Sequence, residues 1–376
     1  METEGTRIVE IVDCCAFHDW PSTHALAPYL SEGWREVFLE PNRKGGPARV
    51  RANPMYVDPM GSKRPSAFPD EGPAGSDPDL LIAQLLDEGG RDRVVLGYDD
   101  ALLSTAFTNL HAARAVIRAA NDWTAEEWLA RDSRLYGLLM VQAAVPEEAA
   151  AEIRRVGGHE RMVGVALGAN ALSTPFGHPV YHPIYEAACE MNLPLVLQVG
   201  SDSATTSSSP PVAGGLPSTY GEYHALAMHP LMSHVATMII QGVFERFPQL
   251  RVMLVGGGAS WLPGYLWRLN YWHKAAHQSA PWLTRLPSDY FRDHFWVTTY
   301  QLERSPSPER LAAVLGTLPW IGSRLVYASG YPNRDAAEPD EVAARLQDDW
   351  RPGVFAANSA ACLRWPVEVP TYGGAT

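Results

Sequence analysis

The stretch YGLLMVQAAVPEEAAAEIRRVGGHERMVGVALG, residues 136–168, contains the pattern that decides the fold. It opens with a short apolar, β-rich run (136–142) and closes with a second one (162–168). Between them, residues 146–156 place apolar side chains at helical spacing, and Pro146 stands near the start, where its missing N–H costs nothing. The pattern predicts a strand, a helix and a second strand.

The same alternation recurs along the whole chain. The predicted strands are residues 7–15, 93–98, 136–142, 162–168, 193–200, 251–257, 295–300 and 324–330. Eight alternations without a Gly-rich dinucleotide-binding turn favour an α/β fold of the (β/α)₈ TIM-barrel type over an open sheet. We therefore expect one domain over residues 1–376, with its chemistry at the carboxyl ends of the strands.

Composition narrows the class of partner. The net charge is −12 and the pI is about 5.5, which disfavours nucleic acid and anionic membrane because both need a basic surface. No run approaches 18 apolar residues, and the acidic N-terminus lacks the features of a signal peptide. Four cysteines in 376 residues do not form a disulfide framework, so we expect a cytoplasmic protein that acts on a small molecule.

Two irregular stretches interrupt the alternation. Residues 41–79 are rich in Pro and Gly and follow the first predicted strand, while residues 201–224 follow the fifth. We interpret both as long loops at the barrel mouth. For residues 41–79 a disordered excursion is an equally good interpretation.

Several motifs then point to a family. They are IVDCCAFHDWPS (11–22), LLIAQLLDEGGRDRVVL (80–96), FERFPQLRV (244–252), SWLP (260–263), RLVYASGYPNRD (324–335) and VFAANSAACLRW (354–365). In this order they resemble the amidohydrolase superfamily, in the branch of metal-dependent decarboxylases related to aminocarboxymuconate semialdehyde decarboxylase. The resemblance covers most of residues 8–365 and implies a TIM barrel that usually dimerises.

The resemblance also implies a metal site, whose ligand positions are altered here. Two first-strand ligands, two residues apart and therefore on one side of the strand, are matched by Cys15 and Phe17. The metal His of the fifth strand is matched by Gln198, and the metal Asp of the last strand by Gly330. Because Phe17 and Gly330 offer no ligand atom and Gln198 is a poor one, we predict no metal and no other cofactor.

Of the remaining family positions, two are altered and one is retained. An acidic residue of the sixth strand is matched by Gly256, and the His after the YP turn by Asn333, whereas a family histidine is retained as His234. With Gly256 and Gly330 lacking side chains and Phe17 adding apolar surface, we expect a roomier, less charged pocket that opens at the mouth. Such a pocket suits an apolar or aromatic ligand.

Four residues are candidates for catalysis, each with a structural alternative. His234 would be an acid, a base or a carboxylate ligand, or else a helix histidine that is hydrogen-bonded behind the site. Gln198 would hold a substrate carbonyl, or be a barrel residue satisfied by its neighbours. Cys15 would be a nucleophile if its pKa were lowered, or an inert buried thiol. His18 would act at the mouth, or as one ligand of a rebuilt metal site, or as a solvated loop residue.

The predicted substrate contacts cluster at strand ends and on the second loop. They are Phe17, Trp20, His224, Trp261, Tyr300, Tyr331, Asn333 and Arg334. The alternatives are packing for the tryptophans and a surface ion pair for Arg334.

Three hypotheses about function follow. The first is a metal-independent enzyme that decarboxylates, isomerises, eliminates or cyclises a small organic acid or aromatic metabolite, for example in natural-product biosynthesis. The second is an inactive subunit that pairs with an active homologue, so that either a homodimer or a heterodimer of related barrels is expected. The third is a metal-dependent hydrolase or decarboxylase with unusual ligands.

Overall fold

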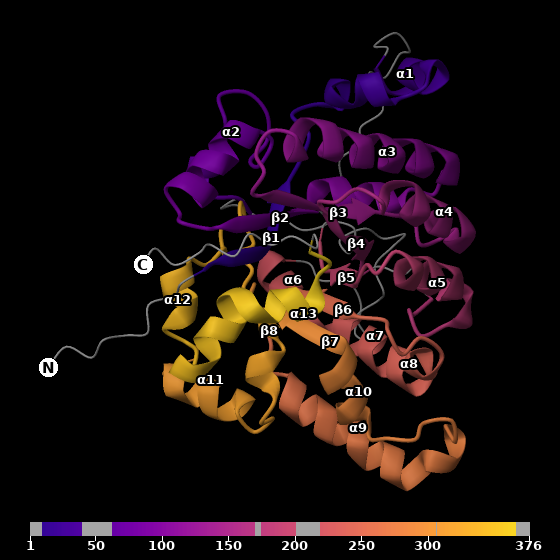
Figure 1. Ribbon diagram of the computed structural model, residues 1–376, viewed down its shortest axis with the longest axis vertical. Helices are drawn as coiled ribbons and strands as arrows, with labels where there is room; N and C mark the ends of the chain where they lie inside the picture. The colour runs from indigo at the N-terminus through magenta and orange to yellow at the C-terminus, as the bar shows by residue number, and fades with distance from the viewer. Residues whose placement is uncertain (1–9, 40–61, 170–173, 201–218, 306, 366–376) are drawn as a thin grey trace, which may run out of the picture.

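A computed structural model describes residues 10–39, 62–169, 174–200, 219–305 and 307–365. Eight parallel strands form one sheet in the order β1 to β8, and helices surround it (Figure 1). The strands are β1 Val12–His18, β2 Arg93–Tyr98, β3 Leu135–Met140, β4 Met162–Gly168, β5 Leu195–Gln198, β6 Val252–Val255, β7 Phe295–Thr298 and β8 Leu325–Val326. The prediction of a (β/α)₈ barrel is confirmed.

Backbone hydrogen bonds between β1 and the segment after β8 join the two ends of the sheet. The amide of Cys14 donates to the carbonyl of Tyr327 (2.8 Å), and the amide of Phe17 donates to Tyr331 (2.6 Å). In return, the amide of Gly330 donates to the carbonyl of Cys15 (3.1 Å). These bonds align the mouth residues of the first and last strands.

Helices pack on the outside of the barrel. They are α1 Glu32–Leu39, α2 Pro78–Leu81, α3 Leu110–Trp123, α4 Pro146–Val156, α5 His182–Glu190, α6 Tyr220–Leu226, α7 Met228–Ile240, α8 Val243–Arg246, α9 Leu262–Ala276, α10 Pro287–His294, α11 Pro308–Leu315, α12 Pro339–Ala343 and α13 Asn358–Cys362. Because the strands are covered on both faces, their sequences are nearly continuous apolar runs. No helix in these ranges is long and apolar enough to cross a membrane.

The first strand differs from its predicted range. We expected residues 7–15, but the strand spans Val12–His18, and residues 7–9 lie outside the described part. Its pairing with β2 shifts in register between Asp13 and Ala16, after which Phe17 and His18 pair with Gly97 and Tyr98. The polar His18 therefore ends a strand rather than beginning a loop.

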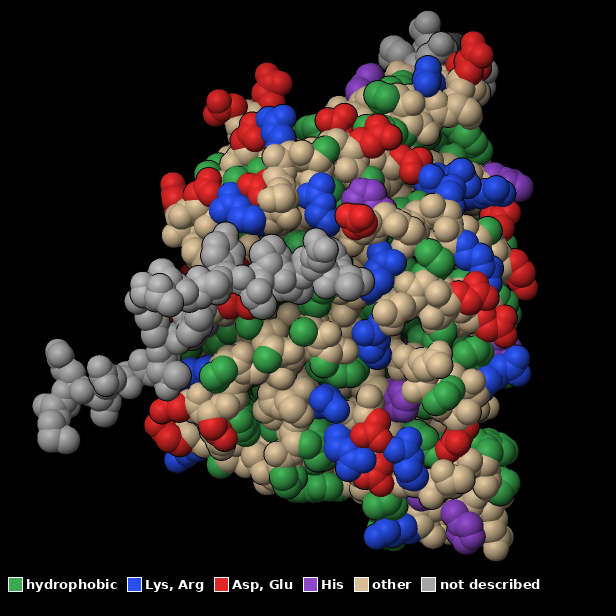
Figure 2. Space-filling model, viewed as in Figure 1, with side chains coloured by type: hydrophobic (Ala, Val, Ile, Leu, Met, Phe, Trp, Pro, Cys, Tyr) green, Lys and Arg blue, Asp and Glu red, His purple; other side chains and the backbone are tan. Residues whose placement is uncertain are grey.

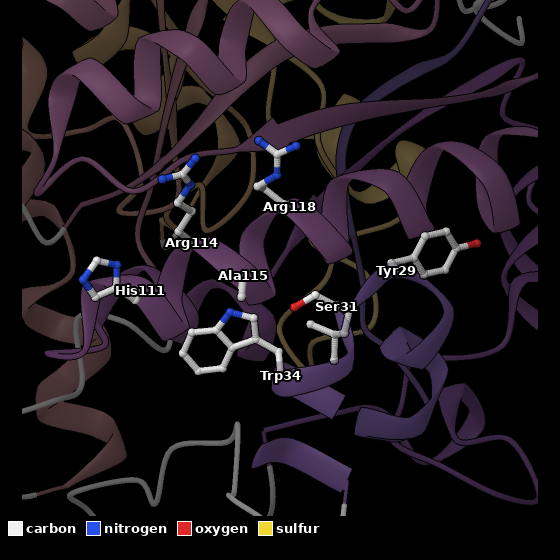
Figure 3. A pocket seen from close by; sticks show the side chains of 8 residues that line it. Tyr29, Ser31, Trp34, His111, Arg114, Ala115 and Arg118 are labelled. Atoms are coloured by element: carbon white, nitrogen blue, oxygen red, sulfur yellow. The ribbon is translucent and has the colours of Figure 1, made fainter. Parts of the chain in front are cut away.

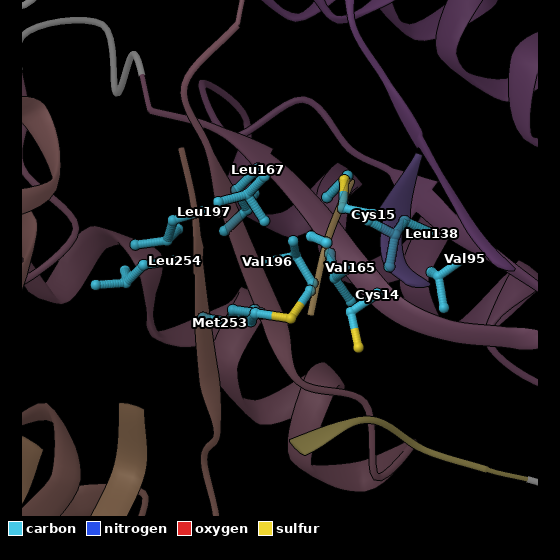
Figure 4. Packing of buried hydrophobic residues seen from close by; sticks show 14 of the residues in the cluster. Cys14, Cys15, Val95, Leu138, Val165, Leu167, Val196, Leu197, Met253 and Leu254 are labelled. Atoms are coloured by element: carbon cyan, nitrogen blue, oxygen red, sulfur yellow. The ribbon is translucent and has the colours of Figure 1, made fainter. Parts of the chain in front are cut away.

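Cys14 and Cys15 point in opposite directions from β1, as Figure 4 shows among the apolar side chains of the neighbouring strands. Alternation of side chains along a strand produces this arrangement. Both thiols are fully buried. Only Cys15 lies on the side of β1 that also carries the ring of Phe17.

Most of the two predicted loops lies outside the described residues, namely 41–61 of the first and 201–218 of the second. In the described part of the first loop, Lys63 forms an antiparallel bridge with Asn333. The amide of Arg64 also donates to the carbonyl of Pro332 (2.9 Å). Residues 62–64 therefore lie against the segment that follows β8, at the mouth.

Acidic and basic side chains are interspersed on the face shown in Figure 2. The chain carries 42 acidic and 30 basic residues. Many of these form surface ion pairs, such as Arg154 with Glu190 at 2.6 Å. Pairs of this kind contribute little to stability individually.

Candidate active site at the barrel mouth

Three side chains, two from β1 and one from β5, meet in the barrel beside Gly97 of β2. A Cβ atom placed on Gly97 would lie 3.0 Å from Cys15 Sγ, 3.2 Å from Gln198 Oε1 and 3.4 Å from Phe17 Cδ1. The absence of a side chain at Gly97 leaves room for all three. The predicted site residues of β1 and β5 are thus brought together.

Gln198 and Cys15, the two polar residues at this point, differ in their hydrogen bonding and their reactivity. Gln198 is fully buried and donates through Nε2 to the carbonyl of Tyr98, while its Oε1 has no hydrogen-bond partner among the described residues. Burial, and then the nearby carboxylates of Asp13 and Asp99, raise the pKa of the Cys15 thiol well above its usual value. The thiol is therefore protonated, which does not suit a nucleophile.

Tyr300 occupies the space that a side chain at position 330 would need. A Cβ on Gly330 would lie 2.0 Å from Tyr300 Cδ2, and Gly330 has a φ of +74°, which disfavours other residues. The ring also packs edge-on against Phe17, with centroids 5.7 Å apart. Our expectation that the glycines make a roomier pocket was wrong at this position, because the neighbouring strand fills the gap.

The same segment after β7 also lies beside Gly256, which follows β6, but at ordinary contact distance. A Cβ there would lie 3.4 Å from Gln301 Oε1 and 3.8 Å from Tyr300 Cδ1. The segment after β7 thus covers both positions at which the sequence lacks a side chain.

The residues at the barrel centre do not fit the metal ion that the family resemblance implies. A thiol whose pKa is raised, one amide oxygen and a phenyl ring come together where an ion would need several imidazole or carboxylate ligands. In the described ranges no group of three or more His, Cys, Asp or Glu side chains is arranged to hold a metal. The structure also leaves no room for a carboxylate at position 330.

Around this centre a chain of polar side chains crosses the mouth. We call it the mouth network: Lys63, Asn333, Tyr300, Asp335, Gln301 and His224. Lys63 donates to Asn333 Oδ1 (2.7 Å), Asn333 donates to the Tyr300 hydroxyl (3.1 Å), and this hydroxyl donates to Asp335 Oδ1 (3.2 Å). The network joins the segments after β7 and β8 to α6 and the first loop.

Lys63 is the cationic end of this network and also pairs with Asp99, at the end of β2. Burial alone would lower the pKa of the lysine, but the carboxylates of Asp99 and Asp100 reverse this, and the net shift is upward. Lys63 is therefore an ammonium ion held at the mouth. A small cavity of about 200 Å³ lies beside it, lined also by Phe17, His18 and Asp19.

A larger pocket of about 540 Å³ lies at the ends of β6, β7 and β8, displaced from the barrel axis. We call it the off-axis pocket. His224 from α6, Gln301 after β7, and Arg334 and Asp335 after β8 all line it. Its volume is that of a site for a small organic ligand.

His18 and His234, two predicted catalytic residues, are buried and hydrogen-bonded at both ring nitrogens. His18 bonds to the carbonyl of Gly97 (2.7 Å) and the hydroxyl of Thr124 (2.8 Å), and its ring stacks on Trp123. His234 Nε2 donates to the carbonyl of Ala169 (2.7 Å), while its Nδ1 accepts from an amide. Burial lowers the pKa of each imidazole to about 4. Neither histidine lines the off-axis pocket. The geometry supports the structural alternative for His234, whereas His18 is buried at the end of β1 and is not a solvated loop residue.

The remaining predicted contacts fall into two groups. Trp20 is buried and packs edge-on against Trp123, and Trp261 donates to the carbonyl of Gly258 (3.2 Å) beside α9. Tyr331 is also buried, which raises the pKa of its hydroxyl to about 12. None of these three lines the off-axis pocket, whereas His224 and Arg334 do.

Four residues at the mouth were not predicted: Lys63, Asp99, Gln301 and Asp335. Asp99, Gln301 and Asp335 follow the ends of β2, β7 and β8, so their positions after predicted strands were an available signal. Lys63 lies in the irregular stretch 41–79, where no periodic pattern indicated its contact with β8.

A further pocket, of about 460 Å³, lies on the outer surface between α1, α3 and the turn η1 Thr23–Tyr29 (Figure 3). Trp34 of α1 lies against it, together with Arg114 and Arg118 of α3. The arginines pair with Glu148 (2.9 Å) and Glu152 (3.6 Å). No residue of the mouth network lines this pocket.

Comparison with known families matches an amidohydrolase model to residues 69–365. The chain belongs to the amidohydrolase family. Gamma-resorcylate decarboxylase of Rhodococcus jostii (strain RHA1) is 25% identical to this amidohydrolase over 261 residues, which are 66% of the present chain and 75% of the relative.

Solved structures show the same fold. 5-Carboxyvanillate decarboxylase LigW from Sphingomonas paucimobilis has a TM-score of 0.63 at 23% identity and covers 94% of this amidohydrolase and 98% of its own chain. A second structure is the 5-carboxyvanillate decarboxylase of Novosphingobium aromaticivorans, complexed with manganese and 4-hydroxy-3-methoxy-5-nitrobenzoic acid. It has a TM-score of 0.64 at 19% identity, and the match covers 96% of this amidohydrolase and 97% of that chain. The recognition of the family from sequence motifs is confirmed.

Proposed function

We propose that this amidohydrolase is a decarboxylase of a small aromatic carboxylic acid, and that it uses acid/base chemistry without a metal ion at the barrel centre. The observation that carries the proposal is the off-axis pocket, which places a histidine from α6 and an arginine and a carboxylate from the segment after β8 around a cavity of about 540 Å³. The named activities of relatives, gamma-resorcylate and 5-carboxyvanillate decarboxylation, support this substrate class.

The reaction requires few groups. When Ar–COO⁻ and a proton become Ar–H and CO₂, the electron pair of the breaking C–C bond passes to the ring carbon, which takes the proton. The protein must hold the carboxylate and supply that proton. Arg334 at the rim is suited to the first task as a guanidinium. Tyr300 and Asp335, joined at 3.2 Å, are suited to relaying the proton.

Gln198 and Cys15 have supporting roles in this proposal. The buried Oε1 of Gln198 is an acceptor for a donor group on a ligand that reaches the barrel axis. Cys15 limits the space beside it as a protonated thiol. Metal independence rests on the misfit of the residues at the centre and on the ring of Tyr300 above Gly330.

An assay that couples turnover to metal content tests the proposal. The protein would be assayed for CO₂ release from gamma-resorcylate, 5-carboxyvanillate and other hydroxybenzoates, before and after chelation, with metal measured by elemental mass spectrometry. We expect turnover that survives chelation, with metal well below one per chain. Loss of activity on chelation and its return with manganese would refute metal independence.

Variants connect the activity to the pocket. His224→Asn should lower kcat/KM at least tenfold, because His224 lines the cavity. The matched control is His111→Asn, since His111 is an exposed histidine of the outer pocket on α3. An equal loss of activity in both variants, or in neither, would remove the off-axis pocket from the proposal.

We also propose that the chain pairs with a second copy of itself through α9. Trp267, Tyr271 and Trp272 are 54%, 67% and 54% exposed, although aromatic side chains of this size are normally covered. Residues 262–286 contain no Asp or Glu, in a chain whose net charge is −12. An apolar, basic helix on an acidic protein complements the acidic surface of another copy.

A further inference from the structure

Gln301 occupies an unusual position in the off-axis pocket. Its φ is +61°, a backbone conformation that a residue with a side chain rarely adopts. Its side chain contacts three groups from three segments: the Gly257 amide after β6, Asp335 after β8, and His224 on α6. Strained residues of this kind persist where the surrounding contacts hold them in place.

The hydrogen bonds fix which way the amide of Gln301 points. Its Oε1 accepts from the amide of Gly257 (2.9 Å), and its Nε2 donates to Asp335 Oδ2 (3.1 Å). The flipped orientation would place two donors together at Gly257 and two acceptors together at Asp335. The second N–H of the same Nε2 therefore points to His224 Nδ1, at 3.1 Å.

This geometry selects one form of His224. Because Nδ1 accepts a hydrogen bond from an N–H, it carries no proton, and the neutral ring is protonated on Nε2. Asp335 Oδ2 is 3.7 Å from the same Nδ1 and would attract a proton there, but it already accepts from Gln301. The other charged groups of the pocket are Arg334, Glu303, Arg304 and Arg345, and Tyr223 adjoins His224 on α6.

We infer that Gln301 is a positioning residue that holds His224 as a neutral Nε2–H donor, and that this donor recognises an anionic oxygen, a carboxylate or phenolate, of an aromatic ligand. The inference rests on the proposed function for its choice of ligand class. It assigns His224 to binding an oxyanion rather than to delivering the proton. Delivery of the proton then falls to Tyr300 and Asp335.

The experiment uses the full chain labelled with ¹⁵N in its 12 histidines, with His224 assigned from the His224→Asn variant. At pH 7.5 we expect the wild type to show an unprotonated Nδ1 and a protonated Nε2 at His224. Gln301→Glu keeps the size of the side chain, but its carboxylate accepts a hydrogen bond from an Nδ1–H and favours the positively charged ring, so both nitrogens of His224 should become protonated. Gln241→Glu, the same change at an exposed position after α7, should leave the spectrum unchanged. A protonated Nδ1 in the wild type would overturn the inference.

Salicylate is the probe of ligand class because it carries both a carboxylate and a phenol. Its titration should shift the Nε2 resonance of His224 and saturate. If salicylate binds but no acid is decarboxylated, the proposed function fails and the inference stands. If acids are turned over while salicylate leaves His224 unshifted, the inference fails and the proposed function stands.

Discussion

At the scale of single residues, much of the altered site follows from one replacement: the ring of Tyr300 fills the volume of the side chain that is missing at position 330. The ring of Tyr300 lies where a side chain at position 330 would lie, so the glycine and the tyrosine require each other. Phe17 completes the contact from β1. The sequence predicted that Gly330 cannot bind a metal, but not that Tyr300 fills its place, because a list of residues does not show which neighbour enters an empty position.

Gly330→Ala should therefore lower the free energy of unfolding by about 2–4 kcal/mol, since it combines overpacking with a left-handed backbone conformation. Urea unfolding would measure the change. Gly158→Ala is the control, because a Cβ on Gly158 meets nothing within 4 Å. In a Tyr300→Ala background the same substitution should cost less, and an equal cost in both backgrounds would contradict the steric explanation.

His234 allows a prediction about acid stability. Burial lowers its pKa from 6.5 to about 4 in the folded chain, so the unfolded chain binds the proton more readily. The resulting stability is present above pH 6.5 and is lost as the pH falls toward 4. By linkage, the loss between pH 8 and pH 5 is about 2 kcal/mol for this residue.

The measurement is the free energy of unfolding at pH 8 and at pH 5 for the wild type and for His234→Gln. The variant cannot titrate, so its pH dependence should be smaller by about 2 kcal/mol, whatever its stability at pH 8. Exposed His111→Gln serves as the matched control and should leave the difference unchanged. Parallel curves for wild type and His234→Gln would show that His234 is not the titrating group.

At the scale of elements, the sequence predicted the strands well and their end positions less well. Strands such as Met162–Gly168 were predicted with the correct bounds, because a strand buried on both faces is a continuous apolar run. β1 was misplaced, since a register shift and a polar last residue obscure its pattern. The mouth network was missed because its members belong to segments that follow different strands and meet only in the folded barrel.

The segment after β7 also stabilises the start of α9 through hydrogen bonds. The Glu303 carboxylate, after β7, accepts hydrogen bonds from the amides of Ala259 (3.0 Å) and Ser260 (3.0 Å) and from the Ser260 hydroxyl (2.6 Å). A Cβ on Gly258 would lie 2.4 Å from this carboxylate, which explains the glycine at that position. The negative charge lies at the positive end of the helix dipole.

Glu303→Ala should then lower the free energy of unfolding by about 1–2 kcal/mol, as the loss of a helix cap does. Chemical denaturation would measure it. Glu309→Ala is a suitable comparison, because Glu309 is an exposed carboxylate in the first turn of α11. Equal small effects at both positions would mean that Glu303 does not stabilise the start of α9.

At the scale of the whole molecule, the barrel and its family followed from the sequence, whereas the exposed aromatic surface that we propose as the contact between copies did not. Alternating apolar runs determine a (β/α)₈ barrel because each strand must be covered by a helix. Exposure of an aromatic side chain depends on what packs above it, and the sequence does not contain that information. Trp128 is fully buried while Trp272 is 54% exposed, although both lie in helical segments.

Tyr271→Glu/Trp272→Glu should convert the proposed dimer into a monomer. The two rings are edge to face on α9, with centroids 5.5 Å apart, and glutamates there would be buried against the other copy without a partner. Light scattering after gel filtration would measure the mass, which is 41.2 kDa for one chain. We expect about twice this mass for the wild type at micromolar concentration and the single-chain mass for the variant.

The control for the dimer is Val314→Glu on α11, which is 45% exposed and lies off α9. It should remain dimeric, because Val314 lies on another helix than the exposed aromatic side chains Trp267, Tyr271 and Trp272. A wild type that elutes at 41.2 kDa would remove the second copy as the partner of α9. A dimer that survives the double substitution would place the contact on another face of the barrel, since two buried, unpaired carboxylates per chain are too costly to keep.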